Sequence, residues 1–209
     1  MKLLIIGASR GIGEKLLAIA LKEKFEVTVL ARNPQKIKLE HPNLSVIKGD
    51  ILDATAVKLA VEGQNAVCLC IGIPPTQKPV DVFSKGTANV LAAIDNNSET
   101  ILLAVTGVGA GDSKGHGGFL YDNIINPLLL KSVYADKDRQ EALIRASSCK
   151  WIIVRPAMLS NGKMTGNYKV INNLAGVTAK KISREDVADF MLNELKHPSC
   201  IHKAPLITY

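Results

Sequence analysis

Aromatic residues are scarce in this chain of 209 residues, and no apolar run is long enough to cross a bilayer. Phe, Trp and Tyr together make up 4% of the residues. A membrane-spanning helix needs about 20 consecutive apolar residues, whereas glycine, proline or charge interrupts every apolar stretch sooner. Few aromatic side chains are present to stack on bases, and the cations behind the net charge of +7 are spread along the chain. We therefore expect neither a membrane nor a nucleic-acid partner.

Cysteine is also rare, and its spacing does not indicate a metal site. Cys68 and Cys70 alternate along one apolar run, whereas Cys149 and Cys200 each stand alone. This is not the pattern of a zinc centre, so we predict no metal ion and thiols that are buried or incidental in a reducing compartment. Met1 leads directly into the apolar run 3–6 without a cleavage site of small residues. We read that run as a strand and expect a cytoplasmic protein.

Short apolar runs alternate with helical patterns along the chain, in a composition that is 47% hydrophobic and 22% charged. The runs are mostly continuous, which is typical of strands covered on both faces. They lie at 3–6, 27–30, 44–47, 66–71, 101–105 and 151–154. Helical patterns lie at 11–23, 54–62, 80–96, 128–147 and 183–195. This order predicts a Rossmann-type α/β fold, with a doubly wound parallel sheet and helices on both faces, in a single domain spanning 1–209.

Two irregular stretches follow predicted strands. Residues 107–118 contain six glycines, and residues 161–181 are rich in Asn, Gly and Lys. Loops at the carboxyl ends of parallel strands are where such sheets bind ligands. We predict that 161–181 forms a small substrate-side loop or lobe, with a short strand at 168–171. The last helix opens with Ser183 and Asp186, a capping-box pattern.

A glycine-rich turn joins the first strand to the first helix. It consists of Gly7, Ala8, Ser9, Arg10, Gly11, Ile12 and Gly13. Glycines there permit a tight turn and a close approach of the backbone to a pyrophosphate, and the helix start offers unpaired N–H groups and a favourable dipole. Because the turn stands between a strand and an amphipathic helix, it predicts a dinucleotide site.

The residue at the end of the second strand indicates which dinucleotide is bound. NAD-specific domains place an acidic residue about twenty residues after the turn, and this chain has Arg32 in the run 29–32. A guanidinium suits a 2′-phosphate, and Arg10 is placed to approach the same group from the other side. Asp50 and Ile51 after the third strand are placed to meet the adenine, although Asp50 or Asp53 would also serve as a helix cap. We therefore predict NADP(H) as the cofactor.

These segments resemble an atypical short-chain dehydrogenase/reductase, of the subgroup that includes NmrA-like proteins and biliverdin/flavin reductases. The resemblance covers essentially the whole chain and rests on the glycine turn, Gly49-Asp50 and the runs 66–72, 104–106, 137–141, 151–156 and 183–188. The glycine spacing of the turn, GxxxGxG, is closer to that of typical short-chain dehydrogenases than to the TGxxGxxG form common in atypical members. The resemblance implies that the cofactor also contacts Ile71, Gly72, Thr106, Lys137 and Pro156. Lys137 would lie near the nicotinamide ribose, and the backbone at Pro156 near the carboxamide.

The match to the typical catalytic pair is incomplete. Typical members have Tyr and Lys four residues apart, but here Tyr134 precedes Lys137 by three and Val133 takes the usual place. Positions three apart still share a helix face. Thr106, Tyr134 and Lys137 are therefore the candidate catalytic residues. Each also has a purely structural interpretation: Thr106 as a β-branched strand residue, Tyr134 as a packing residue and Lys137 as a solvated helix lysine. His116 is a possible proton donor, but we expect it to be exposed in its glycine-rich loop.

The leading hypothesis is an NADP(H)-dependent oxidoreductase of the flavin/biliverdin reductase kind. Hydride would pass from the nicotinamide to a planar small-molecule acceptor, such as a flavin, tetrapyrrole or quinone-like compound, and solvent could supply the proton. The alternative is a non-catalytic NADP(H) sensor of the NmrA-like kind. A sugar-nucleotide epimerase or dehydratase would need a larger carboxyl-terminal domain. The resemblance implies a monomer or weak dimer.

Overall fold

The fold is built around a mostly parallel sheet. A computed structural model describes residues 1–94 and 99–209. Within these residues the sheet has eight strands in the order β3-β2-β1-β4-β5-β6-β10-β8. Their bounds are Leu44–Lys48 (β3), Glu26–Ala31 (β2), Lys2–Ile6 (β1), Ala66–Leu69 (β4), Ile101–Val105 (β5), Lys150–Pro156 (β6), Leu206–Thr208 (β10) and Lys169–Ile171 (β8). A short parallel pair, β7 (Met158–Ser160) and β9 (Lys181–Ser183), lies apart from the sheet order.

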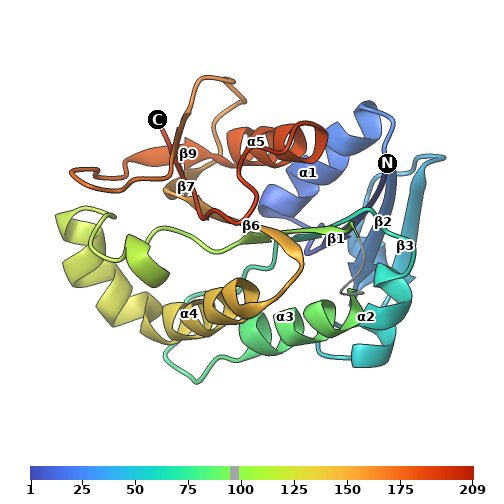
Figure 1. Cartoon of the computed structure of the whole chain (residues 1–209), viewed down its shortest axis with the longest axis horizontal. Coiled ribbons are helices and arrows are strands. Elements are labelled where there is room, and N and C mark those ends of the chain that lie inside the picture. Colours follow the sequence, from blue (N-terminus) through green and yellow to red (C-terminus); the bar gives the residue numbers. More distant parts are fainter. Residues whose placement is uncertain (95–98) are drawn as a thin grey trace.

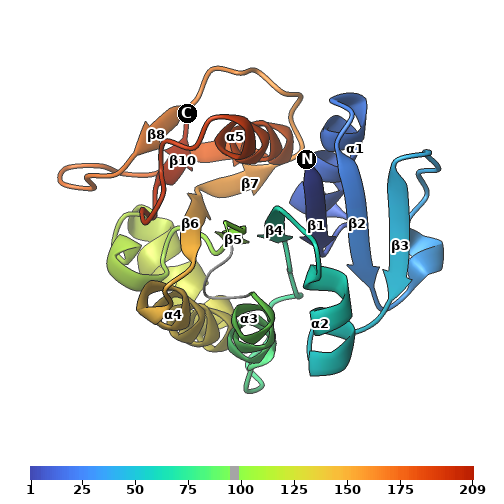
Figure 2. The same cartoon turned by 45° about the vertical axis from the view of Figure 1, so that its right-hand side comes forward.

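Helices cover both faces of the sheet (Figures 1 and 2). On one face α1 (Gly11–Lys22) packs against α5 (Arg184–Lys196). On the other face lie α2 (Ala54–Val61), α3 (Val82–Ala93) and α4 (Lys131–Ala146), packed in that order. Shorter elements are the 3-10 turns η1 (Pro34–Lys36) and η2 (Gly111–Ser113) and a π-helix, η3 (Tyr121–Leu130).

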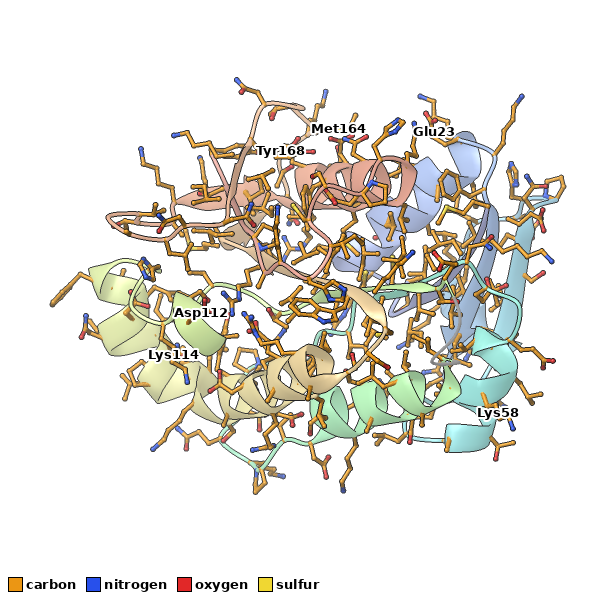
Figure 3. The ribbon with its side chains drawn as sticks, in the orientation of Figure 1. Glu23, Lys58, Asp112, Lys114, Met164 and Tyr168 are labelled. Carbon is orange, nitrogen blue, oxygen red and sulfur yellow. The ribbon has the colours of Figure 1, made fainter. Side chains whose placement is uncertain are left out.

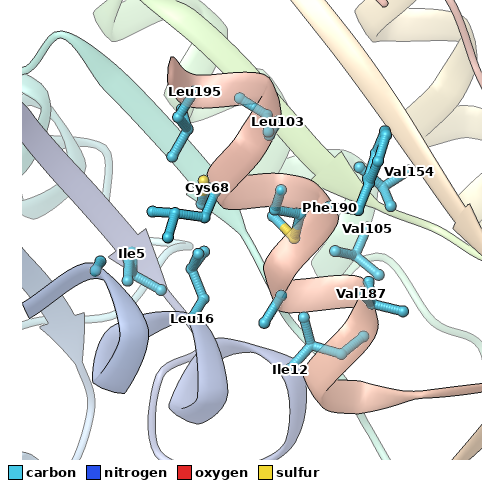
Figure 4. Close-up of a cluster of buried hydrophobic side chains, with 14 of the residues drawn as sticks. Ile5, Ile12, Leu16, Cys68, Leu103, Val105, Val154, Val187, Phe190 and Leu195 are labelled. Carbon is cyan, nitrogen blue, oxygen red and sulfur yellow. The ribbon is translucent and has the colours of Figure 1, made fainter. Parts of the chain in front are cut away.

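The alternation of strand and helix explains the direction of the strands. Strands β1 to β6 and β10 run parallel to their neighbours, and β8 is antiparallel to β10. Side chains of the central strands β1, β4, β5 and β6 are buried on both faces, and two apolar cores form, one under each helix layer. The edge strands β3 and β8 have no buried residue. In Figure 4, Ile12 and Leu16 of α1 face Val187 and Phe190 of α5 across the first core. All parallel strands thus end at one edge, where ligand loops gather.

The predicted α/β Rossmann-type sheet is confirmed. The strand predicted at 168–171 is present as β8, and Ser183 caps α5 by accepting a hydrogen bond from the Asp186 N–H at 2.9 Å. The helix predicted at 80–96 is observed as α3, and Asn96 lies outside the described residues. Among the residues that are described, no helix combines the length and the apolar character that a membrane span requires.

The helix predicted at 128–147 was placed wrongly at its start. The chain is already helical at Tyr121, in a π-helix that contains Pro127, and α4 begins only at Lys131. None of the π-helix residues is buried, and Leu128 is 61% exposed. Proline inside a helical pattern normally marks a helix boundary, so Pro127 explains why the sequence pattern did not indicate a helix that begins at Tyr121.

Candidate cofactor-binding and active site

The glycine turn is packed so closely that side chains are excluded at two positions. Gly7 has φ +99°, and a Cβ there would stand 2.6 Å from the Cys70 carbonyl oxygen. A Cβ on Gly13 would stand 2.4 Å from the Gly7 carbonyl oxygen. Both distances are far below van der Waals contact, so only glycine allows the turn to lie against β4 and α1 to begin directly above it. This is the tight strand-to-helix turn that a dinucleotide diphosphate requires.

The start of α1 is open to an anion. Arg10 is the N-cap residue, its backbone is extended, and no side chain from the described residues caps the helix. The first N–H groups of a helix have no intrahelical partner and carry partial positive charge. Arg10 itself is exposed and places Nη2 3.4 Å from the Gly72 carbonyl oxygen. The turn and the α1 start thus form a donor set that fits a diphosphate. The Arg10 guanidinium lies at the Gly72 side of the turn, and its approach to a 2′-phosphate beside Arg32 stays a prediction.

Other residues of the turn have separate roles. Ala8 and Ile12 are buried in the core beneath α1, whereas Ser9 is exposed. Ile71, after β4, packs on the opposite core, and the adjacent Gly72 has no atom within 4 Å of its Cβ position. The backbone at 71–72 therefore borders the turn with open space beside it.

Arg32 and Asp50, which are predicted to lie at the adenine end of a cofactor, follow the ends of β2 and β3. Arg32 is exposed and has no ion-pair partner in the described parts of the chain. Asp50 is half-buried, and its Oδ1 accepts a hydrogen bond from the Leu52 N–H at 3.0 Å. The cap of α2 is Asp53, whose Oδ1 accepts hydrogen bonds from Thr55 and Ala56. Asp50 does not cap this helix.

Ile51 takes part in the core rather than in an open site. Its side chain is buried and fits against Gly86, where a Cβ would come within 2.7 Å of it. Its carbonyl oxygen accepts a hydrogen bond from Asn89 at 2.9 Å. Any contact of Ile51 with a cofactor would have to come from its remaining backbone atoms.

Lys137 is buried beneath the end of β5. Its Nζ donates hydrogen bonds to the carbonyl oxygens of Thr106 at 2.5 Å and Val105 at 3.3 Å, and lies 4.7 Å from the centroid of the Phe83 ring. Burial lowers the pKa of Lys137 to about 8, although Glu141 and Asp136 act to raise it. The Lys137 side chain therefore holds the end of β5 in place through these two carbonyl groups. Its ammonium loses its proton at a lower pH than an ordinary lysine does.

Thr106 belongs to a buried polar cluster. Its Oγ1 donates a hydrogen bond to Glu141 Oε1 at 2.7 Å. The same carboxylate accepts from Arg155 Nε at 3.0 Å and forms an ion pair with Arg155 Nη2. The side chains of Glu141 and Arg155 are 2% and 1% exposed. The Thr106 hydroxyl is thus directed toward α4 and β6.

Tyr134 reaches the same strand end from α4. Its hydroxyl stands 2.8 Å from the Cβ position of Gly107 and accepts a hydrogen bond from the Tyr121 hydroxyl at 2.6 Å. Burial raises the pKa of Tyr134 well above its usual value, and the nearby Tyr121 hydroxyl raises it further. Tyr134 is therefore a neutral phenol at physiological pH. The structure places Thr106, Tyr134 and Lys137 at the end of β5, with the side chain of each hydrogen-bonded to other protein groups.

The loop 107–118 is held in place from three sides. Asp112 forms an ion pair with Arg155 and a second one, at 3.2 Å, with Arg145. Lys114 pairs with Asp138 of α4, and Figure 3 shows Asp112 and Lys114 on the loop beside that helix. The expectation of an exposed His116 was wrong. It is half-buried because its Nδ1 lies 2.8 Å from the Val177 carbonyl oxygen, tying the loop to the 161–181 segment.

Pro156 contacts the 107–118 loop, and the 161–181 segment is anchored to α5. Pro156 is buried in β6, and its carbonyl oxygen accepts a hydrogen bond from the Val108 N–H at 3.0 Å. Asp186 at the start of α5 accepts hydrogen bonds from the Thr165 and Gly166 N–H groups at 2.8 and 2.9 Å. Burial would raise the pKa of Asp186, but hydrogen bonds from Tyr209 and these amides lower it. The segment is thereby anchored to the helix that packs on α1.

Sequence reasoning missed the residues that connect these parts. Tyr121, Glu141 and Arg155 were not predicted as site residues, because each depends on a contact between distant segments. The cap of α3 was missed for the same reason. Asp81 precedes α3 but does not cap it, and the buried Asp136 of α4 accepts from the Phe83 N–H at 2.8 Å instead. The only signal in the sequence was the charged stretch 136–141 within an amphipathic helix.

Comparison with known proteins agrees with this geometry. The family model described as NAD(P)H-binding matches residues 7–198, from the glycine turn to the end of α5. The chain belongs to this NAD(P)H-binding family. A relative, the uncharacterized protein YwnB of Bacillus subtilis (strain 168), is 29% identical over 205 residues, which cover 95% of this chain and 93% of that protein.

Solved structures share the fold along the whole chain. ChuY from Escherichia coli O157:H7, described as an anaerobillin reductase, is 21% identical, with a TM-score of 0.83 over 100% of this chain and 97% of its own. A short-chain dehydrogenase/reductase (wide type) from Veillonella parvula DSM 2008, solved in complex with NADP, is 20% identical. Its TM-score is 0.79, over 100% of this chain and 94% of its own. At these identities the likeness concerns the fold of the NAD(P)H-binding family.

Proposed function

We propose that this chain is an NADP(H)-dependent oxidoreductase that passes hydride from the nicotinamide to a planar small-molecule acceptor. The acceptor would be a flavin, tetrapyrrole or quinone-like compound. Residues 1–209 would act as one cofactor-binding domain, with 161–181 as its substrate-side lobe. The observation that carries the proposal is the glycine turn, which is too tight for a side chain at Gly7 or Gly13 and opens on an uncapped helix. That turn supports dinucleotide binding.

The preference for a 2′-phosphate rests on Arg32. It stands where NAD-specific domains have a carboxylate, and no described carboxylate neutralises it. A guanidinium makes paired, charge-assisted hydrogen bonds to phosphate. The Veillonella structure, which contains NADP, is in accord with this preference.

The chemistry asks little of the protein beyond orientation. When bound, the nicotinamide supplies the hydride. Lys137 fixes the end of β5, and Tyr134 presents a neutral phenol whose oxygen already accepts a hydrogen bond from Tyr121. Tyr134 therefore keeps its own proton available for donation. An acceptor protonated by Tyr134 or by solvent fits this site better than an alcohol, which needs the regular Tyr–Lys pair.

One observation favours the alternative, an NADP(H)-binding sensor that does not turn over. The Thr106 hydroxyl is used by Glu141, and the Lys137 ammonium is used by backbone carbonyls. If they stay so engaged when the cofactor binds, the site binds a dinucleotide without acting on it. This is the NmrA-like alternative, and activity measurements separate it from the reductase.

The test combines binding and turnover. Calorimetric titration with NADPH and NADH measures the preference, and loss of nicotinamide absorbance after addition of FMN or biliverdin measures turnover. NADPH oxidation supports the reductase, and tight binding without oxidation supports the sensor. Binding of neither dinucleotide contradicts both.

Arg32→Asp tests the phosphate role. We expect NADPH affinity to fall by about tenfold or more, as for a lost charge-assisted hydrogen bond, and NADH affinity to change far less. Lys22→Asp is the matched control, because it makes the same charge change at the far end of α1. An equal loss for both dinucleotides would rule out the role of Arg32.

A further inference from the structure

Arg184 lies beside the glycine turn although it is far from it in sequence. It is the first residue of α5, which packs along α1. Its Nε and Cδ stand 3.9 and 4.0 Å from the position that a Cβ on Gly11 would occupy. Figure 4 shows the same neighbourhood, where Val187 near the start of α5 lies next to Ile12 near the start of α1. The starts of both helices therefore meet at the turn.

The charge of Arg184 is not cancelled by its surroundings. Its Nη1 donates a hydrogen bond to the Asn161 side-chain oxygen at 2.7 Å, and Asn161 is neutral. Within the described residues Arg184 forms no ion pair. The adjacent Glu185 is engaged elsewhere, by the Lys15 ammonium at 2.9 Å and the Met164 N–H at 2.8 Å. The side chain of the half-buried Arg184 thus lies beside the turn, and its guanidinium is hydrogen-bonded to a neutral amide.

We propose that Arg184 binds the diphosphate of the dinucleotide, a contact that extends the proposed function and rests on it. The α1 start supplies N–H groups, and Arg184 supplies a full positive charge and a planar set of donors from the other helix. Arg184 adjoins Gly11, at the helix start, whereas Arg32 follows β2. The two arginines therefore recognise different phosphates, Arg184 the diphosphate common to NADPH and NADH and Arg32 the 2′-phosphate.

The contact also links the substrate-side lobe to the cofactor. Asn161, which holds Arg184, is the first residue of the 161–181 segment. Thr165 and Gly166 of that segment are fixed to Asp186, two residues after Arg184. A diphosphate bound by Arg184 would therefore stabilise this end of the lobe.

The experiment measures the affinity of Arg184→Gln for three probes, NADPH, NADH and 2′-AMP. We expect the affinities for NADPH and NADH to fall by the same factor, about tenfold. The affinity for 2′-AMP, which has the 2′-phosphate but no diphosphate, should not change. Arg184→Lys keeps the charge and should recover part of the loss. Lys22→Gln removes the same charge about 16 Å away along α1 and should alter none of the affinities.

Each outcome separates this inference from the function on which it rests. Unchanged dinucleotide affinities in Arg184→Gln would overturn the role of Arg184 and leave the proposed function standing. A loss that includes 2′-AMP would also overturn it, because such a loss indicates a general distortion. Thermal denaturation followed by circular dichroism identifies a folding defect. If the wild-type protein binds neither dinucleotide, the proposed function fails and the inference with it.

Discussion

The buried pair between Glu141 and Arg155 gives the sharpest prediction of stability. Both side chains are almost fully buried, and the Glu141 carboxylate accepts from Arg155 Nε, Arg155 Nη2 and Thr106 Oγ1. Glu141→Gln keeps the shape but removes the charge and places an N–H₂ group against these donors. Breaking a buried pair on one side costs about 3–5 kcal/mol. Since 1 kcal/mol shifts the melting temperature of a chain of this size by about 2–4 °C, we expect that temperature to fall by about 6–20 °C.

Thermal and urea denaturation of four proteins and one control variant provide the assay. They are the wild type, Glu141→Gln, Arg155→Met and the double variant Glu141→Leu/Arg155→Met. The double variant should be more stable than either single one, because it leaves no uncompensated buried charge. Asp81→Asn, which breaks the exposed pair between Asp81 and Lys85, should have no measurable effect. If Glu141→Gln is as harmless as Asp81→Asn, the account of the cluster is refuted.

Two further variants test the turn and the buried lysine. Gly13→Ala should weaken NADPH binding by more than tenfold in calorimetry, because its Cβ would stand 2.4 Å from the Gly7 carbonyl oxygen. Gly162→Ala is the control: its Cβ would meet only ordinary van der Waals contacts, so NADPH binding should not change. Lys137→Met tests the pKa of about 8. Since the unfolded lysine keeps its proton up to about pH 10.5, wild-type stability should rise by up to about 3 kcal/mol relative to the variant as pH rises from 8 to 10.5. Parallel pH dependences of unfolding would show that Lys137 is not perturbed.

Elements with a buried face could be predicted from the sequence. The strand at 101–105 has its predicted bounds, and Val187, Phe190, Met191 and Leu195 of the last helix are all buried. The glycine turn was also found, because its requirements are local. Each of these patterns depends only on how one short segment packs against the sheet.

Features that depend on pairs of distant segments could not be predicted. Asp81 has the sequence position of an N-cap for α3, but Asp136 caps it from α4. Arg155 lies in an apolar strand, and nothing nearby in sequence shows that Glu141 neutralises it. The role of Arg184 depends in the same way on the packing of α5 against α1. Tertiary contacts decide these cases, and a single sequence does not record them.

The arrangement of α4 limits how this site could be redesigned. Asp136 is held at the start of α3, and Lys137 is held at the end of β5, so the rotation of α4 about its axis is fixed at two consecutive residues. Val133 stands where typical short-chain dehydrogenases, which this chain resembles, have their catalytic tyrosine, and it is packed with Val80 and Phe83. Val133→Tyr would drive a phenol ring into that cluster and overpack it. Converting this chain into an alcohol dehydrogenase would therefore require rebuilding the contact between α3 and α4.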